Sequence, residues 1–549
     1  MLALMLAGVT SSAALSQDAS FSYFRYEGSD PRFSAQIDGR RQYYNPVLAG
    51  YYPDPSLTRK GDTYYLVNSS FGFFPGVPIF ESKDLVNWEQ TGHVLDRPEQ
   101  LNLQGHAAST DGIYAPAISY NPGNDTFYMI TTLVGPHGGN FFVKSRNPRE
   151  GWSDPVWLPE IDGIDPSFLF DDDGKAYIVH NAPVFGEPSY EGERAIRLFE
   201  FDTATDRIVS QPLEIVRGGT HVKKNPIWIE GPHLYHIGDY YYLMCAEGGT
   251  AEDHSEVIFR SRSPKGPWEE APANPILTQR DLPAERENPV TCTGHADIIQ
   301  TPEGEWWAVF LGCRPYSGNL YNTGRDTYLL PVEWQDGWPR ILESGRGVPT
   351  VAGKEGLIPA QNTLTGNFSY EDRFEDAVLN PRWIYLRNAP ATGVDLSDGR
   401  LHLTPGPGIA DRDNPISAVF ARQQHPNFTV ETEVDFTPSS SGDLAGLALL
   451  QNEDHNFIFG KTLLEGEPAI VLKRNNWGET LVGSARIEFS GPMELKVEGE
   501  GGYYSFYYRQ SGEEQWRPVA VGVDATNLST AKAGGFIGAV IGPFATSRN

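Results

Sequence analysis

Three acidic residues stand beside prolines at the start of strand-like segments, far apart in the sequence. They are Asp54 in "YYPDPS", Asp165 in "GIDPSFLF" and Glu230 in "WIEGPHLY". Carboxyl groups around one cleft can take different roles in the hydrolysis of a glycosidic bond. One protonates the leaving oxygen, and another, ionised, acts as base or nucleophile. An aspartate before proline is also a common turn residue, so the fold must bring the three together for this chemistry.

The elements that would position these acids form a repeat. Each of five units has a turn, an aromatic-rich strand and a second strand, with turn residues at Asp62, Asp125, Asp173, Asp239 and Gly304. No segment of helical period lies between the units, which predicts radial β-sheets in a five-bladed β-propeller. The innermost strand of each blade lines the axis, so acids at its start would converge. Tandem hairpins in one large sandwich would explain the strands but not the repeated order.

The chain is predicted to be all-β, with two domains. We assign residues 40–345 to the propeller and the Gly/Pro-rich residues 346–365 to a linker. Residues 366–549 contain stretches that alternate with period two, such as "TVETEVDF", "MELKVEGE" and "YYSFYYRQ". They predict a lectin-like (concanavalin A-like) β-sandwich.

Charge narrows the classes of partner. Of the 549 residues, 71 are acidic and 43 basic, giving a net charge of −28. Such a surface repels phosphate backbones and anionic lipid, so nucleic acid is excluded and a neutral substrate is favoured.

The N-terminus predicts export. Residues 1–18, "MLALMLAGVTSSAALSQD", have a short apolar core followed by small residues, as in a secretory signal. We expect a periplasmic or extracellular protein, and no other stretch reaches the length of a membrane span. The cysteines Cys245, Cys292 and Cys313 lack metal-site spacing, which leaves one disulfide bridge or three buried thiols open.

Long motifs resemble glycoside hydrolase family 43, in its β-xylosidase and α-L-arabinofuranosidase branch. They include "NPVLAGYYPDPSL", "IDPSFLFDDDGKAYIVH" and "IEGPHLYHIGDYYYLMCAEGGT", and the likeness covers about residues 45–340. The resemblance implies a five-bladed propeller and hydrolysis with inversion. It implies that Asp54 is the general base and Glu230 the general acid, and that Asp165 raises the pKa of that acid. Inversion then predicts base and acid carboxyl groups about 6.5–9.5 Å apart.

The same resemblance suggests further substrate-binding residues. Arg325 in "TGRDT" matches an arginine that binds sugar hydroxyls, the alternative being a surface ion pair with Asp326. His295 in "TGHAD" matches an axial histidine that in some members accompanies a structural calcium ion, the alternative being a histidine bonded to backbone. Phe71 in "SSFGFFPG" and Thr250 in "AEGGT" fall where the family shapes its pocket.

One departure from the family bears on the substrate. Xylosidase relatives usually carry Trp in "GVWAP", whereas this chain has Tyr114 in "GIYAP". The resemblance therefore implies an exo-glycosidase that releases β-D-xylose or α-L-arabinofuranose from xylo- or arabino-oligosaccharides and needs no cofactor for its chemistry. A non-catalytic propeller–lectin protein that binds carbohydrate is the alternative. It has no use for all three acids.

Overall fold

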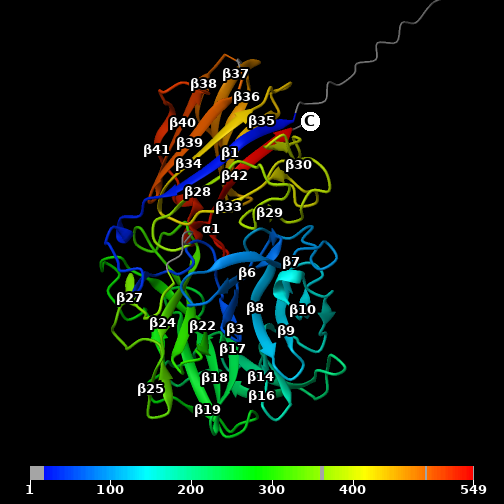
Figure 1. The fold of residues 1–549 in the computed structure, drawn as a ribbon, viewed down its shortest axis with the longest axis vertical. Coiled ribbons are helices and arrows are strands. Elements are labelled where there is room, and N and C mark those ends of the chain that lie inside the picture. The colour runs from blue at the N-terminus through cyan, green and yellow to red at the C-terminus, as the bar shows by residue number, and fades with distance from the viewer. Residues whose placement is uncertain (1–17, 359–363, 489–490, 548–549) are drawn as a thin grey trace, which may run out of the picture.

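The computed structural model describes residues 18–358, 364–488 and 491–547, and it is almost entirely β-structure in two stacked domains (Figure 1). Residues 1–17 of the predicted signal lie outside the described residues. No helix in the described part of the chain is long and apolar enough to cross a membrane. The short helical segments are η1 (Pro31–Phe33), η2 (Pro148–Glu150), η3 (Thr526–Leu528) and α1 (Thr530–Ala533).

The lower domain is the predicted five-bladed propeller. Its blades are antiparallel sheets. Blade 1 comprises β3 (Ser56–Lys60), β4 (Thr63–Val67), β6 (Gly76–Ser82) and β7 (Glu89–Leu95), and blade 2 comprises β8 (Gly112–Asn121), β9 (Thr126–Val134), β10 (Gly139–Ser145) and β11 (Val156–Trp157). Blade 3 comprises β12 (Ile164–Phe170), β13 (Ala176–Pro183), β14 (Arg194–Asp202), β15 (Arg207–Ile208) and β16 (Leu213–Arg217). Blade 4 comprises β17 (Glu230–Ile237), β18 (Tyr240–Glu247), β19 (Ser255–Ser261), β20 (Glu269–Glu270) and β21 (Leu277–Thr278), and blade 5 comprises β22 (Thr291–Gln300), β23 (Trp306–Cys313) and β24 (Arg325–Pro331).

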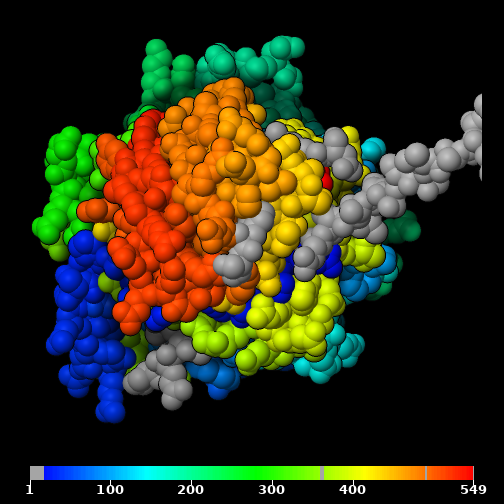
Figure 2. Space-filling view, turned by 90° about the horizontal axis from the view of Figure 1, so that it is seen from above, coloured from blue at the N-terminus to red at the C-terminus, as the bar shows by residue number. Residues whose placement is uncertain are grey.

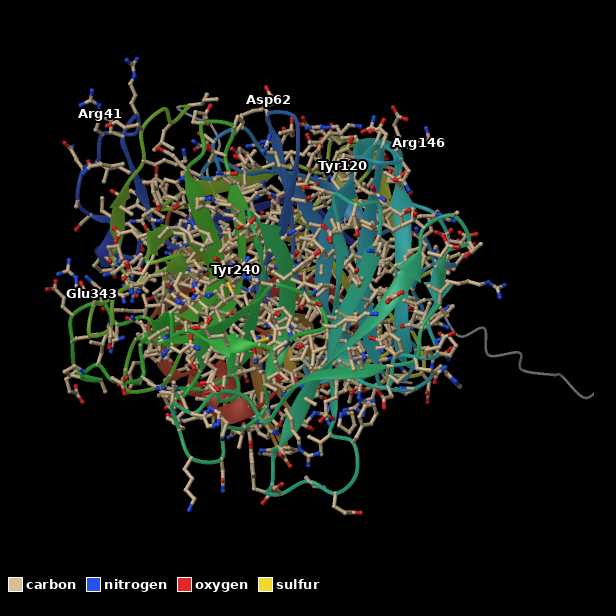
Figure 3. The ribbon with its side chains drawn as sticks, turned by 90° about the horizontal axis from the view of Figure 1, so that it is seen from below. Arg41, Asp62, Tyr120, Arg146, Tyr240 and Glu343 are labelled. Atoms are coloured by element: carbon tan, nitrogen blue, oxygen red, sulfur yellow. The ribbon has the colours of Figure 1, made fainter. Side chains whose placement is uncertain are left out.

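The five predicted turn residues all lie between the first and second strands of their blades. These turns mark the propeller end remote from the upper domain. Figure 3 looks at that end, with Asp62, Tyr120 and Tyr240 labelled on blades 1, 2 and 4. One apolar cluster fills each of the five interfaces between neighbouring blades, so aromatic strand faces are buried around the whole ring.

The ring is closed by a segment that precedes blade 1. The amide N–H of Val47 donates to the carbonyl of Thr327 in β24 (2.9 Å), and the Thr327 amide donates to Leu48 (3.1 Å). The Asn45 side-chain amide donates a hydrogen bond to the Leu329 carbonyl of the same strand, and its oxygen accepts one from the Leu329 amide. Residues 45–48 therefore cover the free edge of blade 5, which would otherwise offer unpaired backbone groups.

The upper domain is the predicted concanavalin A-like β-sandwich. One sheet contains β30 (Val394–Ser397), β31 (Arg400–Leu403), β1 (Ala19–Gly28), β34 (Asn427–Asp435), β39 (Met493–Glu500), β40 (Tyr503–Gln510) and β41 (Arg517–Asp524), with β28 (Ser369–Asp372) beside β1. The other contains β32 (Ser417–Ala418), β42 (Val540–Ser547), β35 (Asp443–Asn452), β36 (His455–Leu464), β37 (Glu467–Asn476) and β38 (Glu479–Arg486), with β33 (Ala421–Arg422) beside β42. Burial alternates along β34 as the sequence pattern requires.

Strand β1 belongs to the sandwich, although residues 19–39 were assigned to neither domain from the sequence. It pairs with β31, β28 and β34 in the interior of its sheet. Phe21, Phe24 and Tyr26 point from it into the core between the two sheets. The propeller is thus inserted between the first and second strands of the sandwich.

Short sheets and an apolar cluster join the domains. The sheets pair β2 (Gln42–Tyr44) with β27 (Val351–Gly353) and β5 (Phe73–Phe74) with β29 (Tyr385–Leu386), while β25 (Glu333–Gln335) and β26 (Trp338–Arg340) form a hairpin after blade 5. Tyr51, Phe71 and Phe73 of the propeller pack against sandwich residues that include Phe420 and Ile537. Seen from above, the sandwich, coloured yellow to red, covers one end of the propeller (Figure 2).

The three cysteines are buried free thiols. Cys292 and Cys313 pack together with Tyr321 in blade 5, whereas Cys245 lies in blade 4. The sequence left open either one disulfide bridge or three buried thiols, and the structure shows three buried thiols.

Removing the Phe24 side chain should destabilise the sandwich. Phe24 is buried, and its ring lies 5.0 Å from that of Trp383 in an edge-to-face contact. We expect Phe24→Ala to lower the free energy of unfolding by about 3–5 kcal/mol. Urea unfolding followed by tryptophan fluorescence measures the loss. Glu27→Ala, at an exposed position of the same strand, is the control and should change little. Equal effects of the two substitutions would contradict the placement of β1.

Candidate active site

One backbone conformation recurs at the axial end of every blade. Near the start of each inner strand, one residue has a positive φ, between 35° and 56°, and in four blades a proline follows it. We call these the axial residues: Asp54, Ala115, Asp165, Gly231 and His295. Residues other than glycine rarely adopt this left-handed backbone conformation. Those that do so cluster at functional sites.

The axial residues line a single small cavity on the propeller axis. The pairing of the inner strands shifts register around Ala115, Asp165, Gly231 and His295, which turns these residues out of the regular ladder. Asp54 and Asp165 are both buried there. The predicted convergence of acids from different blades is therefore observed for these two.

Glu230 differs in position from the two aspartates. We expected all three acids in one equivalent position, but Gly231 is the axial residue of blade 4, and Glu230 precedes it by one. Tyr114 is its counterpart in blade 2, one residue before Ala115. Glu230 is partly accessible, unlike Asp54 and Asp165. A partly accessible carboxyl group directly before the cavity-lining Gly231 can reach a bound molecule while its charge still acts on the buried pair.

Asp54 is held ionised by its neighbours. Arg325 Nη1 donates to Asp54 Oδ1 (2.7 Å), and the Ser69 hydroxyl donates to Oδ2 (2.6 Å). Burial raises the pKa of Asp54, but Arg325, His295 and the Ser69 hydrogen bond outweigh it, so the pKa lies below its usual value. Burial lowers the pKa of His295 itself to about 4, so near neutral pH that ring is uncharged and Arg325 supplies the positive charge.

Glu230 and Asp165 have the opposite character. Burial, then the charge of Asp165 and then that of Asp54 raise the pKa of Glu230 to about 8. Burial and Asp54 raise the pKa of Asp165 to about 7, opposed by a hydrogen bond from the Gly231 amide (3.0 Å). The two groups titrate as a pair, and the more basic member, Glu230, holds a proton near neutral pH. One ionised and one protonated carboxyl group thus lie close enough at this end of the axis to influence each other.

Aromatic rings from both domains enclose one side of the site. The Phe71 ring lies 4.9 Å from Tyr114 edge to face and 5.9 Å from Phe536 in a stacked arrangement. Phe536 comes from the segment between α1 and β42 of the sandwich, and its carbonyl accepts hydrogen bonds from Arg325 Nε (3.4 Å) and Nη2 (3.2 Å). The sandwich therefore contributes a wall and a fixed contact to the arginine that pairs with Asp54.

Other predicted residues fall around this centre. Arg325 is buried and bonds Asp54, so the alternative of a surface ion pair with Asp326 is wrong; Asp326 pairs with Arg314 instead (2.7 Å). Contact of Arg325 with sugar stays a prediction. His295 Nδ1 lies 3.6 Å from Asp54 Oδ1. Thr250 lies partly buried in the loop after β18, apart from the aromatic wall.

Two functional residues were missed from the sequence. Ser69 is the first residue of the quoted "SSFGFFPG" motif, in which only Phe71 was singled out. Its hydroxyl also accepts a hydrogen bond from the Ala115 amide (2.7 Å), which ties blade 1 to blade 2. Phe536 lies in "GGFIGAVIGPF", far beyond the propeller, where no local pattern points to a pocket.

A calcium ion beside His295 stays a prediction, and the donor set fits it poorly. Calcium takes six to eight oxygen ligands. The nearest carboxylate, Asp54, is already engaged by Arg325 and Ser69. Among the described residues no group of three or more His, Cys, Asp or Glu side chains could hold a metal. We derive no chemical step through a metal.

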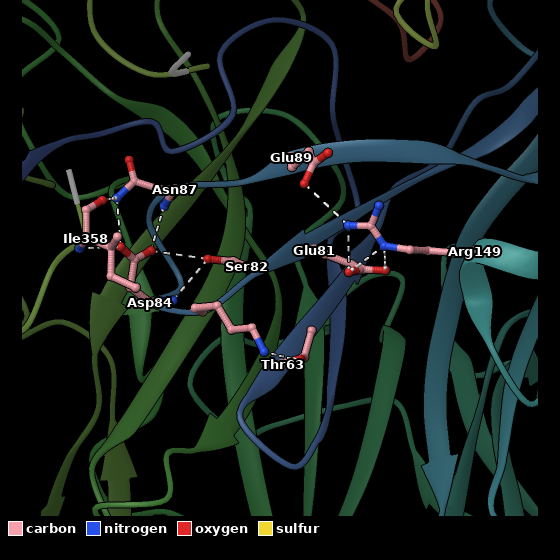
Figure 4. Close-up of a pocket in the computed structure, with 9 residues that line it drawn as sticks. Thr63, Glu81, Ser82, Asp84, Asn87, Glu89, Arg149 and Ile358 are labelled. Atoms are coloured by element: carbon pink, nitrogen blue, oxygen red, sulfur yellow. Dashed lines mark hydrogen bonds and ion pairs between the residues drawn. The ribbon is translucent and has the colours of Figure 1, made fainter. Parts of the chain in front are cut away.

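A second hollow, of about 230 Å³, lies at the opposite end of blade 1 (Figure 4). Each of its charged side chains already has a partner. Arg149 bonds Glu81 (3.0 Å) and Glu89 (3.3 Å), and Asp84 accepts hydrogen bonds from Asn87 and from the Ile358 amide. These contacts brace the segment after blade 5 against blade 1 and leave no carboxyl group poised for catalysis.

Comparisons with known proteins agree with this geometry. The family model described as "Glycosyl hydrolases family 43" matches residues 43–339, and that described as "Beta xylosidase C-terminal Concanavalin A-like domain" matches residues 371–549. The chain is 36% identical over 516 residues to a "Xylosidase/arabinosidase" of Butyrivibrio fibrisolvens, covering 92% of this chain and 95% of that protein. It is 35% identical to a "Non-reducing end alpha-L-arabinofuranosidase" of Bacteroides ovatus, covering 92% of each. A crystal structure of a GH43_12 protein from capybara gut metagenome superposes with a TM-score of 0.88 at 40% identity, covering 97% of this chain and 100% of that one.

The raised pKa of Glu230 predicts a pH-dependent gain of stability in Glu230→Gln. In the unfolded chain Glu230 ionises near pH 4.5, whereas in the folded protein it keeps its proton to about pH 8. The folded state therefore loses stability as pH rises through this window, and the neutral amide avoids the loss. We expect no gain in stability at pH 4 and a clear gain at pH 8, because each unit by which the pKa is raised corresponds to about 1.4 kcal/mol of stability.

Calorimetric melting of both proteins from pH 4 to pH 9 measures this effect. Glu252→Gln, an exposed change in the loop after β18, is the matched control and should show no trend. A gain for Glu230→Gln that is the same at every pH would contradict the raised pKa.

Proposed function

Because the chain belongs to glycosyl hydrolase family 43, we propose that it is an exo-acting, inverting glycosidase that releases terminal β-D-xylose or α-L-arabinofuranose from hemicellulose oligosaccharides. The observation that carries this proposal is the division of charge among the carboxyl groups at the axial end of the blades. Asp54 is ionised beside Arg325, and Glu230 is protonated beside Asp165. A general base and a general acid are then present together near neutral pH.

The proposed reaction uses these groups in turn. Asp54 takes a proton from a water molecule as its oxygen attacks the anomeric carbon. The glycosidic C–O bond breaks at the same time, and Glu230 gives its proton to the leaving oxygen. Asp165 keeps that proton on Glu230 until it is needed, because its charge disfavours ionisation of the neighbour. Exchange with solvent then restores both carboxyl groups, and no cofactor takes part.

The aromatic wall supports the exo mode. Phe71, Tyr114 and Phe536 close one side of the site with packed rings, and the Phe536 carbonyl is anchored by Arg325. A chain end fits such a pocket, whereas the middle of a polymer would need an opening on both sides. The Tyr114 hydroxyl donates to the Thr110 carbonyl. Tyrosine is smaller than the Trp that the family resemblance leads one to expect, so this ring leaves more room. This difference supports both xylose and arabinofuranose as candidates for the terminal sugar.

Substrate cleavage by three proteins tests the proposal. We expect the wild type to hydrolyse xylobiose or α-1,5-L-arabinobiose and at least one of the matching nitrophenyl glycosides. Glu230→Gln should lose about 10²–10⁴-fold on the disaccharide and much less on the nitrophenyl glycoside, because nitrophenolate leaves with little protonation. Asp54→Asn should fail on both substrates. The ratio of rates on the two nitrophenyl glycosides gives the pentose preference.

Proton NMR of the first-formed sugar checks the stereochemistry. Inversion predicts that a β-xyloside yields α-xylose first, and that an α-arabinofuranoside yields the β anomer. A product with retained configuration would contradict the roles given to Asp54 and Glu230. A wild type that binds these oligosaccharides but cleaves none would favour the binding-protein alternative.

The pH profile tests the role of Asp165. The kcat/KM of the wild type should fall above about pH 8, where Glu230 loses its proton. Asp165→Asn removes the negative charge that raises the pKa of Glu230, so the alkaline limb should move to lower pH. Asp172→Asn, in the exposed hairpin turn of the same blade, is the control. An alkaline limb that stays in place in Asp165→Asn would show that Asp165 does not set the pKa of the acid.

A further inference from the structure

An exposed tryptophan lies close to the proposed general acid. Trp228 precedes Glu230 by two residues, in the loop 218–229 that joins β16 to β17. Its side chain is 49% exposed, and its backbone has a φ of +51°. Its amide donates to the Gly192 carbonyl (3.0 Å), which fixes the strained backbone. A large apolar side chain held in a left-handed conformation beside a catalytic cavity needs a reason other than packing.

Two glycines leave room for the indole to pack on the protein. A Cβ atom on Gly249 would come within 2.8 Å of Trp228 Cε3, and one on Gly192 would come 3.5 Å from Nε1. The ring thus packs against the loop that carries Thr250. The side chain is fixed by these contacts while nearly half of its surface stays open to solvent.

Trp228 is part of a larger apolar rim. Phe185, 46% exposed, follows β13, and Val222, 43% exposed, lies in the same loop as Trp228. The two loops contact each other, since the Tyr190 hydroxyl donates to the Pro226 carbonyl (2.8 Å). We call Phe185, Val222 and Trp228 the blade 3–4 rim. Exposed apolar side chains on two loops in contact are candidates for a binding surface.

We propose that Trp228 is the platform on which the leaving sugar stacks. This inference rests on the proposed function and extends it to the far side of the scissile bond. The terminal sugar fills the side enclosed by Phe71, Tyr114 and Phe536. Glu230 gives its proton to the leaving oxygen, so the next sugar must lie past Glu230, where Trp228 is. An indole face offers apolar contact to the C–H face of a neutral sugar, which suits a protein of net charge −28.

Comparing the affinity for a disaccharide with the affinity for a monosaccharide isolates the contact between Trp228 and the leaving sugar. The measurement uses calorimetry on full-length Glu230→Gln protein, which binds without turnover, with xylobiose or arabinobiose and with the corresponding monosaccharide. Adding Trp228→Ala should raise the Kd of the disaccharide about tenfold, the effect of losing about 1.4 kcal/mol. The Kd of the monosaccharide should not change. Trp228→Phe should retain most of the disaccharide affinity, because it keeps an aromatic face.

Trp477→Ala in the same background is the matched control. Trp477 is 75% exposed and also has a positive φ (57°), but it lies on the hairpin between β37 and β38 of the sandwich. Its loss should leave both affinities unchanged. The inference is overturned if Trp228→Ala leaves disaccharide binding intact, if it weakens the monosaccharide equally, or if Trp477→Ala gives the same loss.

The proposed function is tested separately in protein that keeps Glu230. If that protein cleaves neither disaccharide, the proposed function fails and the platform fails with it. If it cleaves one of them and Trp228→Ala cleaves it with unchanged kcat/KM, only the platform is wrong.

Discussion

The buried ion pair between Asp54 and Arg325 is the interaction on which most of this architecture depends. Asp54 precedes the first strand of blade 1, and Arg325 begins the last strand of blade 5, so their 2.7 Å contact closes the ring from inside. The same guanidinium bonds the carbonyl of Phe536, which fixes the sandwich over the site. It also keeps Asp54 ionised in a cavity whose burial favours the neutral acid. Arg325 therefore contributes to ring closure, to the docking of the two domains and to the negative charge of the proposed base.

The strained axial residues explain how five similar sheets produce one asymmetric centre. Each blade supplies the same left-handed position, and the side chain there decides its contribution. Aspartate in blades 1 and 3 brings charge, alanine and glycine in blades 2 and 4 leave space, and histidine in blade 5 is neutral. The space above Gly231 matters in particular, because a Cβ on that glycine would come to 3.0 Å from the His295 ring. Glu230 takes its separate position because glycine, and not it, occupies the strained site.

How much could be predicted from sequence depended on whether the interaction was local. Turn residues such as Asp62 and Asp239, and strands such as β39 and β40, follow from short-range patterns and were located correctly. The acids were found because each has a proline nearby. Contacts between residues far apart in the sequence have no such local pattern. Nothing near Ala19–Gly28 shows that its partners lie in the second half of the chain, and nothing near Phe536 shows that it faces Arg325. Arg325 was given a surface alternative because Asp326 is adjacent, whereas the fold pairs each residue with a distant partner.

The insertion of the propeller between β1 and the rest of the sandwich has a consequence for how the protein is made. On the ribosome β1 emerges first, yet β31 and β34 emerge only after the whole propeller has been synthesised. The propeller can therefore fold while an apolar strand beside it still has two unpaired edges, the kind of segment that associates with other chains. Completion of the sandwich then brings Phe536 onto the aromatic wall. The closed pocket therefore requires the C-terminal segment that carries Phe536.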